Sequence, residues 1–179
     1  MVYKISSSND YSSFALDRSY SDREKCLLFG QLLNASKGLI ALNECPEVVG
    51  YACDRLERGD FMSFITGFLL ANVRSKSLLV GRFPGSFQSI VARVSDEEWH
   101  ILKPPVIACL DEEKTKFSTP KLLTVRGSIK APFFKQEAIV NCPVFCPSGY
   151  DSIVYCSDAF RDFVTDAGLT GLDFDPVGG

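Results

Sequence analysis

The sequence predicts a single α+β domain built on a mostly antiparallel sheet with a few helices, and three observations lead to this fold class. Its 179 residues match the length of one compact domain. Short β-prone runs, separated by Pro, Gly and charged turns, fill the middle of the chain. A strand–helix–strand pattern closes it. No repeat or linker interrupts the chain, so we expect one domain over residues 1–179.

Elements in the first half of the chain follow from alternation and from turn-forming residues. Short strands are expected at residues 2–6, 13–17, 38–42 and 60–64, while residues 26–33 are ambiguous between helix and strand. A helix is expected over residues 72–83. Val73, Lys76, Leu79 and Val80 would share one of its faces, and Pro84 with Gly85 would end it.

The middle and the end of the chain carry clearer signals. β-prone runs are expected at residues 89–94, 99–102, 106–110, 121–126 and 137–140. A strand at 152–156 should lead into a helix that Ser157 caps and that Asp158 stabilises through the helix dipole. The apolar stripe of this helix consists of Phe160, Phe163, Val164 and Ala167. Gly168 would then adopt the left-handed position that ends the helix, with Leu169 folding back on Val164, before a last strand at 172–177.

Charge and cysteine usage restrict the class of protein. The chain has 19 Lys and Arg against 22 Asp and Glu residues, a net charge of −3, which gives no basic footprint for nucleic acid. Its seven cysteines are odd in number and widely spaced, which is typical of reduced thiols in the cytoplasm. No signal peptide or lipidation motif is seen, and the apolar stretch at residues 61–73 is shorter than the roughly 20 residues that span a bilayer. We expect a soluble cytoplasmic protein with no membrane contact, and we expect that stretch to lie in the core.

Motifs for catalysis or metal binding are weak. Cys142 and Cys146 have the spacing of half a zinc site, but no second close pair exists and the sole histidine, His100, lies in an apolar strand. A Cys–His nucleophile is conceivable, although no cysteine has an activating cation or helix start beside it. His100 is better explained as a partly buried, hydrogen-bonded strand residue. The chain is therefore expected to be neither an enzyme nor a binder of metals or cofactors.

Carboxylates and aromatics supply the candidates for binding a partner. Acidic residues cluster around Asp60, at residues 96–98 and at residues 111–113, where they form either solvated turns or an acidic surface that steers a basic partner. The aromatic pair in the Pro-bounded segment 131–135 would anchor an interface if it is exposed. The candidate partner-binding residues are Asp96, Glu97, Glu98, Asp111, Glu112, Glu113, Phe133 and Phe134.

Roughly the last two-thirds of the chain resembles a known family, and its C-terminal segment carries the most specific motif. In residues 153–177 a strand enters a Ser-led helix, which is followed by Ala167-Gly168-Leu169-Thr170-Gly171 and a strand containing an aromatic residue. This order resembles the end of the bacterial immunity protein 11 family, whose members are encoded beside polymorphic toxins. Gly59-Asp60-Phe61 and the segment 110–117 resemble two further motifs of that family. The first 45 residues offer little to match, and Cys156 stands where a valine-like residue is commoner.

The resemblance implies a non-enzymatic immunity protein, or antitoxin. Such a protein binds a cognate toxin, encoded by the adjacent gene, and neutralises it by stoichiometric occlusion of the toxin's active site. The resemblance identifies neither the toxin nor the interface. Two alternatives remain open: a small cysteine- or metal-dependent enzyme, and a general protein-interaction module.

Overall fold

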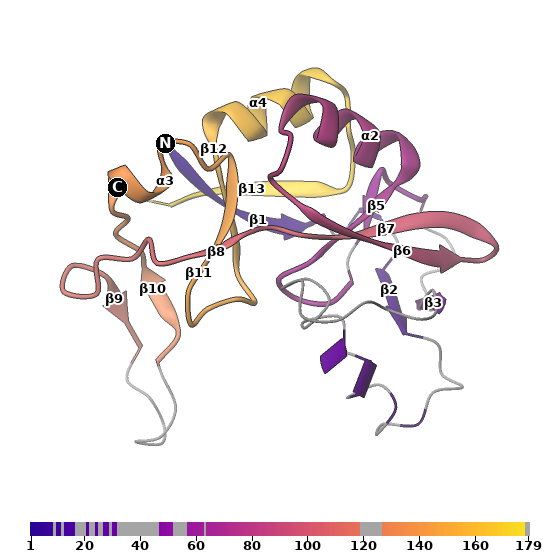
Figure 1. Cartoon of the computed structure of the whole chain (residues 1–179), viewed down its shortest axis with the longest axis horizontal. Coiled ribbons are helices and arrows are strands. Elements are labelled where there is room, and N and C mark those ends of the chain that lie inside the picture. The colour runs from indigo at the N-terminus through magenta and orange to yellow at the C-terminus, as the bar shows by residue number, and fades with distance from the viewer. Residues whose placement is uncertain are drawn as a thin grey trace.

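The computed structural model describes residues 1–8, 10–11, 13–16, 21, 24, 27–28, 30–31, 47–51, 57–62, 64–118 and 127–177. Two β-sheets lie side by side in these residues, two helices cover the same face of both, and a two-stranded ribbon projects from one end (Figure 1). The α+β fold with mostly antiparallel pairing is therefore confirmed. No helix in these residues has the length and apolar character needed to cross a membrane.

The first sheet is built around the N-terminal strand. β1 (Val2–Ser7) pairs antiparallel with β12 (Val154–Ser157) on one side and with β13 (Leu172–Val177) on the other. β11 (Val144–Pro147) continues the sheet antiparallel to β12, and β8 (Val106–Ile107) runs parallel to β11 at its edge. The first strand of the chain thus lies between two strands from its end.

The second sheet has the order β2–β3–β6–β7–β5–β4. Its strands are β2 (Ser13–Leu16), β3 (Glu47–Tyr51), β4 (Phe61–Met62), β5 (Leu69–Asn72), β6 (Gln88–Val94) and β7 (Glu97–Lys103). All neighbours are antiparallel except β3 and β6. The expected strands near residues 13, 60, 89 and 99 are confirmed, while the one at 38–42 lies outside the described residues. In the ambiguous segment 26–33, the four described residues, 27, 28, 30 and 31, are helical.

α2 (Val73–Arg82) begins where expected, because the side chain of Asn72 accepts the backbone N–H of Ser75 at 2.8 Å. The expected apolar face is only partly correct. Ser75 and Leu79 are the buried residues of this helix, whereas Val73 and Val80 are exposed. Only the face of the helix that carries Ser75 and Leu79 packs on β5 and β7. Side chains at adjacent positions, such as Val80, therefore reach solvent.

α4 (Asp158–Asp166) ends as its sequence predicts. Gly168 has a φ of +61°, and the N–H of Leu169 donates to the carbonyl of Val164 at 3.0 Å. Phe160 and Val164 are fully buried. Ser157 is the N-cap residue, as expected, but its hydroxyl accepts no N–H of the helix and instead donates to the carbonyl of Pro143 at 3.3 Å.

One expected strand is a helix. The β-prone run at residues 137–140 predicts a strand, but Gln136–Ile139 form the short helix α3, in which the N–H of Val140 donates a hydrogen bond to the carbonyl of Gln136. The expected strand at 121–126 lies outside the described residues. The ribbon consists of β9 (Lys116–Phe117) and β10 (Ile129–Ala131), which pair antiparallel on either side of that segment.

The main core lies between the helices and both sheets. Its buried members come from the first sheet, the second sheet, the two helices and the turn after α4: Tyr3, Ile5, Val144, Cys146, Val154 and Cys156; Phe61, Leu69, Ala71 and Leu102; Leu79, Phe160 and Val164; and Leu169. Separate clusters pack on the opposite face of each sheet, around Trp99 in the second and around Phe134 and Phe145 in the first. The apolar stretch that begins at residue 61 is part of this core, as expected.

Candidate functional site

The β6–β7 hairpin holds the first carboxylate cluster at one end of the molecule (Figure 1). The two strands pair from Gln88 and Lys103 to Val94 and Glu97, without a break in register. Ser95 and Asp96 close the hairpin with φ values of +47° and +67°. Two consecutive residues with positive φ are typical of the tight turn whose twist matches that of the strands. The hairpin therefore holds the side chains at its tip on two fully paired strands.

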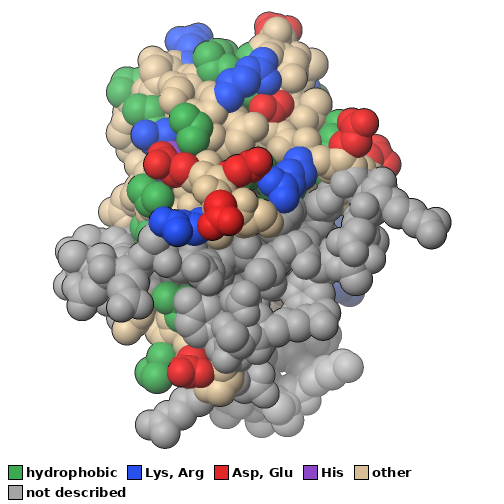
Figure 2. Space-filling view, turned by 90° about the vertical axis from the view of Figure 1, so that its right-hand side faces the viewer, with side chains coloured by type: hydrophobic (Ala, Val, Ile, Leu, Met, Phe, Trp, Pro, Cys, Tyr) green, Lys and Arg blue, Asp and Glu red, His purple; other side chains and the backbone are tan. Residues whose placement is uncertain are grey.

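The three carboxylates of the tip point in different directions. Asp96 lies in the turn, while Glu97 and Glu98 occupy successive strand positions and so face opposite sides of the sheet. Glu97 accepts a hydrogen bond from Arg58 at 2.8 Å, and Glu98 lies 3.1 Å from the Nε2 atom of His100. All three are exposed. Figure 2 looks at this end of the molecule, where acidic and basic side chains alternate.

His100 is the buried neighbour of this cluster. Its Nδ1 atom lies 3.3 Å from the hydroxyl of Ser89, so the imidazole joins β6 to β7, as expected for a hydrogen-bonded strand residue. Burial, and then the nearby ammonium of Lys76, lower the pKa of His100 below its ordinary value and outweigh the opposite effect of Glu98. The ring is therefore neutral at neutral pH. Its described hydrogen-bond partners are Ser89 and Glu98, neither of them a thiol.

The second carboxylate cluster lies at the opposite end of the molecule, before β9 (Figure 1). Asp111 accepts the backbone N–H groups of Glu113 and Lys114, both at 3.2 Å, and pairs with the ammonium of Lys114 at 3.3 Å. Glu112 and Glu113 are exposed. Asp111 thus shapes the turn, and the structure does not bring the two expected acidic clusters together.

The aromatic pair separates into one core residue and one surface residue. Phe134 is 3% exposed and packs edge-to-face against Phe145 and Tyr155, with ring centroids at 5.5 and 5.1 Å. Its assignment as an interface anchor is therefore wrong. Phe133 is exposed, and the ammonium of Lys114 lies 4.8 Å from its ring centre. Consecutive residues point to opposite sides of an extended chain, so only one of the two could face solvent.

The described cysteines have the surroundings of core residues. Cys109, Cys146 and Cys156 are buried, and burial raises the pKa of the Cys109 and Cys146 thiols to about 11. A raised pKa keeps the thiol protonated and lowers its nucleophilicity. Within the residues that the structure describes, no three His, Cys, Asp or Glu side chains are arranged to hold a metal ion. Cys142 and Cys146 therefore have no further ligands there.

Asp60 connects two of the motifs on which the family resemblance rests. Its carboxylate accepts the backbone N–H of Thr170 at 3.1 Å, and the N–H of the next residue, Phe61, donates to the carbonyl of Thr170 at 2.9 Å. Burial alone would raise the pKa of Asp60, but hydrogen bonds from Asn72 and Thr170 and the charge of Arg74 lower it overall. Gly59-Asp60-Phe61 and the segment after α4 therefore form one interlocked unit.

Sequence reasoning missed Lys103, which is buried at the junction of the two sheets. Its ammonium donates to the carbonyls of Gly67 at 2.9 Å and Asp151 at 2.7 Å, and it lies 3.6 Å from the sulfur of Cys146. A lysine at the end of an apolar strand, directly before two prolines, was the available signal. Such a lysine is also compatible with a solvent-exposed strand end, so the sequence alone does not reveal its burial.

Comparison with known proteins adds no family to this description. No protein-family model matches the chain, and a search of curated proteins gives no match. The functional argument therefore rests on the residues and their geometry.

Proposed function

We propose that this chain is an immunity protein: a cytoplasmic, non-enzymatic inhibitor that binds a toxin encoded by the adjacent gene and covers its active site. The observation that carries the proposal is the continuously paired β6–β7 hairpin, which presents exposed Asp96, Glu97 and Glu98 at one end of the molecule. A hairpin that is already ordered loses little conformational entropy when it binds. Clustered carboxylates raise the association rate with a basic partner.

The surroundings of Glu97 indicate the kind of contact that such a partner would make. Glu97 already accepts a guanidinium hydrogen bond from Arg58, with both side chains substantially exposed to solvent. An exposed ion pair of this type contributes about 0–1 kcal/mol, so a cation of the partner can replace Arg58 with little loss. The proposed interface is therefore centred on Asp96 and Glu97, and Glu98 adds to the negative electrostatic potential around them.

The interlocked unit around Asp60 is compatible with the family resemblance on which the proposal draws. The motifs quoted for the resemblance lie far apart in the sequence, yet Asp60 and Phe61 bond directly to Thr170. Motifs that depend on each other in the fold are expected to occur together in a family. These contacts stabilise the fold, whereas the identity of the bound toxin would depend on the exposed residues.

Co-expression with the protein encoded immediately upstream tests the proposal. If the neighbour is toxic when expressed alone, this chain should restore growth and elute with the neighbour in a fixed ratio. A harmless neighbour, or growth rescue without a complex, would contradict it. Turnover of a substrate by the isolated chain would favour the enzymatic alternative.

The site is tested by neutralising each acidic cluster without changing its shape. The triple variant Asp96→Asn, Glu97→Gln, Glu98→Gln keeps a residue that tolerates positive φ in the turn. We expect it to slow association with the toxin about tenfold or more at low salt, and less at high salt. The control is Glu112→Gln with Glu113→Gln, at the other end of the molecule, which should leave the association rate unchanged. Equal effects of the two variants would show that net charge, and not the hairpin, governs binding.

A further inference from the structure

The modest net charge of the chain conceals a strongly uneven distribution. Residues 114–135 contain six of the 19 Lys and Arg residues and no carboxylate. All 22 Asp and Glu residues therefore lie elsewhere. The six cations are Lys114, Lys116, Lys121, Arg126, Lys130 and Lys135. Folding does not require a segment in which all charged residues are basic within a chain of negative net charge.

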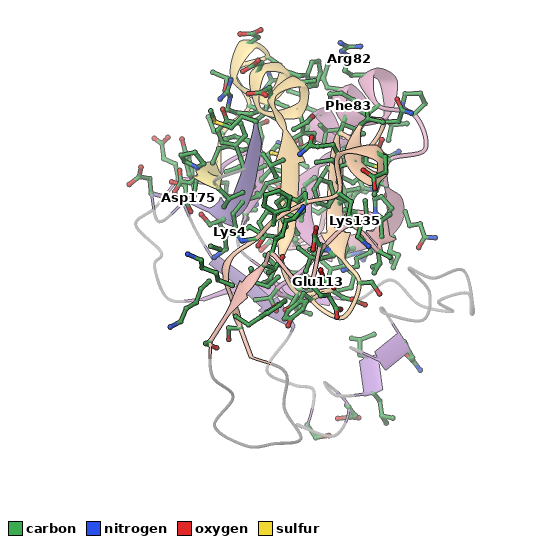
Figure 3. All side chains as sticks on the ribbon, turned by 90° about the vertical axis from the view of Figure 1, so that its left-hand side faces the viewer. Lys4, Arg82, Phe83, Glu113, Lys135 and Asp175 are labelled. Atoms are coloured by element: carbon green, nitrogen blue, oxygen red, sulfur yellow. The ribbon has the colours of Figure 1, made fainter. Side chains whose placement is uncertain are left out.

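This basic segment contains the ribbon of β9 and β10, which projects away from the two sheets (Figure 1). Lys116 and Lys130, one on each strand, are exposed. Among the residues that the structure describes, Lys114 pairs with Asp111, while Lys116, Lys130 and Lys135 form no ion pair. Figure 3 shows this end of the molecule, with Lys135 and Glu113 labelled. The two lysines of the ribbon thus carry positive charge that no carboxylate of the described residues pairs with.

An apolar side chain accompanies these cations. Phe133 is 37% exposed, and the ammonium of Lys114 lies 4.8 Å from its ring centre. The ribbon is anchored to the body by stacking of Phe117 on Tyr150, with ring centroids 5.8 Å apart, and by the hydroxyl of Tyr150, which donates to the carbonyl of Gly127 at 3.0 Å. An exposed aromatic ring close to a basic ribbon that is fixed to the body offers a partner both an apolar contact and positive charge.

We infer that the β9–β10 ribbon is an interaction surface for a protein partner that presents clustered carboxylates beside an apolar side chain. The cations Lys116 and Lys130 would meet the carboxylates, and Phe133 would pack against the apolar group. The inference does not depend on whether that partner is a toxin. It concerns the end of the molecule opposite the acidic hairpin.

Charge placement favours an acidic protein over a nucleic acid. A nucleic-acid strand or duplex carries charge along its whole length, so it would extend from the ribbon over the acidic remainder of the chain. The exposed Glu112 and Glu113 stand directly before the ribbon and would repel it there. A compact patch of carboxylates has no charge to extend along the chain, so it can contact Lys116 and Lys130 alone.

The experiment uses the full chain and two labelled probes, a short peptide of alternating Glu and Leu and a DNA duplex, with fluorescence anisotropy at low and physiological salt. The ribbon variant is Lys116→Ser with Lys130→Ser. The matched control, Arg82→Ser with Arg93→Ser, removes the same charge from exposed positions outside the ribbon. All substituted side chains are exposed, and far-UV circular dichroism checks the fold of each variant.

We expect the peptide to bind the wild-type chain more tightly than DNA does. Affinity for the peptide should fall about tenfold in the ribbon variant, as loss of two charge contacts predicts, and change less than twofold in the control. Phe133→Ser should weaken peptide binding further without changing its salt dependence. Equal losses in the two charge variants, absence of peptide binding at low salt, or a preference for DNA would each overturn the inference.

Discussion

Lys103 illustrates how one side chain can join two sheets. It belongs to β7 of the second sheet, and its ammonium donates to the carbonyls of Gly67 and Asp151 and approaches Cys146 of the first sheet. The ring of Phe68 lies 4.9 Å from the same ammonium. We expect Lys103→Met, which keeps the length of the side chain but removes the donor, to lower the free energy of unfolding by about 2 kcal/mol, because the buried carbonyl of Gly67 and the partly buried carbonyl of Asp151 lose a charged donor. Urea denaturation measures this loss.

The control for this prediction is the same substitution at an exposed site. Lys130→Met on the ribbon should change stability by no more than about 0.5 kcal/mol. If Lys103→Met is as stable as the wild type, the desolvation of the ammonium cancels its hydrogen bonds. In that case the junction between the sheets is held by apolar contacts alone.

His100 predicts a pH dependence of stability with a defined sign. Its pKa is lowered in the folded protein from an unfolded value near 6.5, so between the two values the unfolded chain binds more protons. The free energy of unfolding should therefore fall as the pH is lowered below about 6.5. Because the chain has one histidine, His100→Gln should flatten the dependence between about pH 7.5 and 5.5. Urea midpoints measured across this range test it, and an unchanged slope in the variant would assign the effect to other groups.

At the level of single residues, the sequence identifies candidates more readily than their orientation. Glu97 and Glu98 are adjacent in the sequence, but their side chains lie on opposite faces of the sheet. Glu97 pairs with Arg58, and Glu98 pairs with His100. Phe133 and Phe134 divide in the same way between surface and core. Which member of each pair faces solvent depends on which face of the strand is covered, and that is decided by distant parts of the chain.

The junction between β4 and β13 depends on a glycine. A Cβ atom at Gly171 would lie 1.9 Å from the carbonyl oxygen of Phe61, and the residue has a φ of +100°. We expect Gly171→Ala to lower the free energy of unfolding by about 3 kcal/mol or more, since both the backbone strain and the clash must be relieved. Gly81→Ala in α2 meets open space and should instead raise stability by about 0.5–1 kcal/mol. Equal effects at the two sites would contradict the proposed interlock.

Elements with local signals were the ones that the sequence could predict. α4 combines an apolar stripe with a glycine stop, and both lie within a few residues of the helix. α3 was assigned wrongly because a four-residue helix is too short for a periodic pattern to be visible. The order of strands, with β1 between β12 and β13 and with two parallel pairs, depends on contacts across most of the chain. Composition and alternation contain no information about such contacts.

On the scale of the whole molecule, the two proposed binding surfaces lie at opposite ends. The acidic hairpin occupies one end and the basic ribbon the other (Figure 1). The candidate carboxylates at 111–113 lie at the ribbon end, where Lys114 already pairs with Asp111. A partner of ordinary size that docks on the hairpin would leave the ribbon free. The two proposed surfaces can therefore be disabled separately, which makes the two sets of charge variants independent tests.

The shared core predicts that the two sheets unfold together. Leu69, Ala71 and Leu102 of the second sheet belong to the same buried cluster as Tyr3 and Val154 of the first. Trp99, the single tryptophan, is buried in the second sheet and reports on it alone, whereas far-UV circular dichroism reports on both. We expect the two signals to give the same urea midpoint, because neither sheet can lose the common core without exposing the apolar face of the other. A tryptophan transition at a different urea concentration would show that the sheets are separate folding units, and the junction at Lys103 would then be a contact between them.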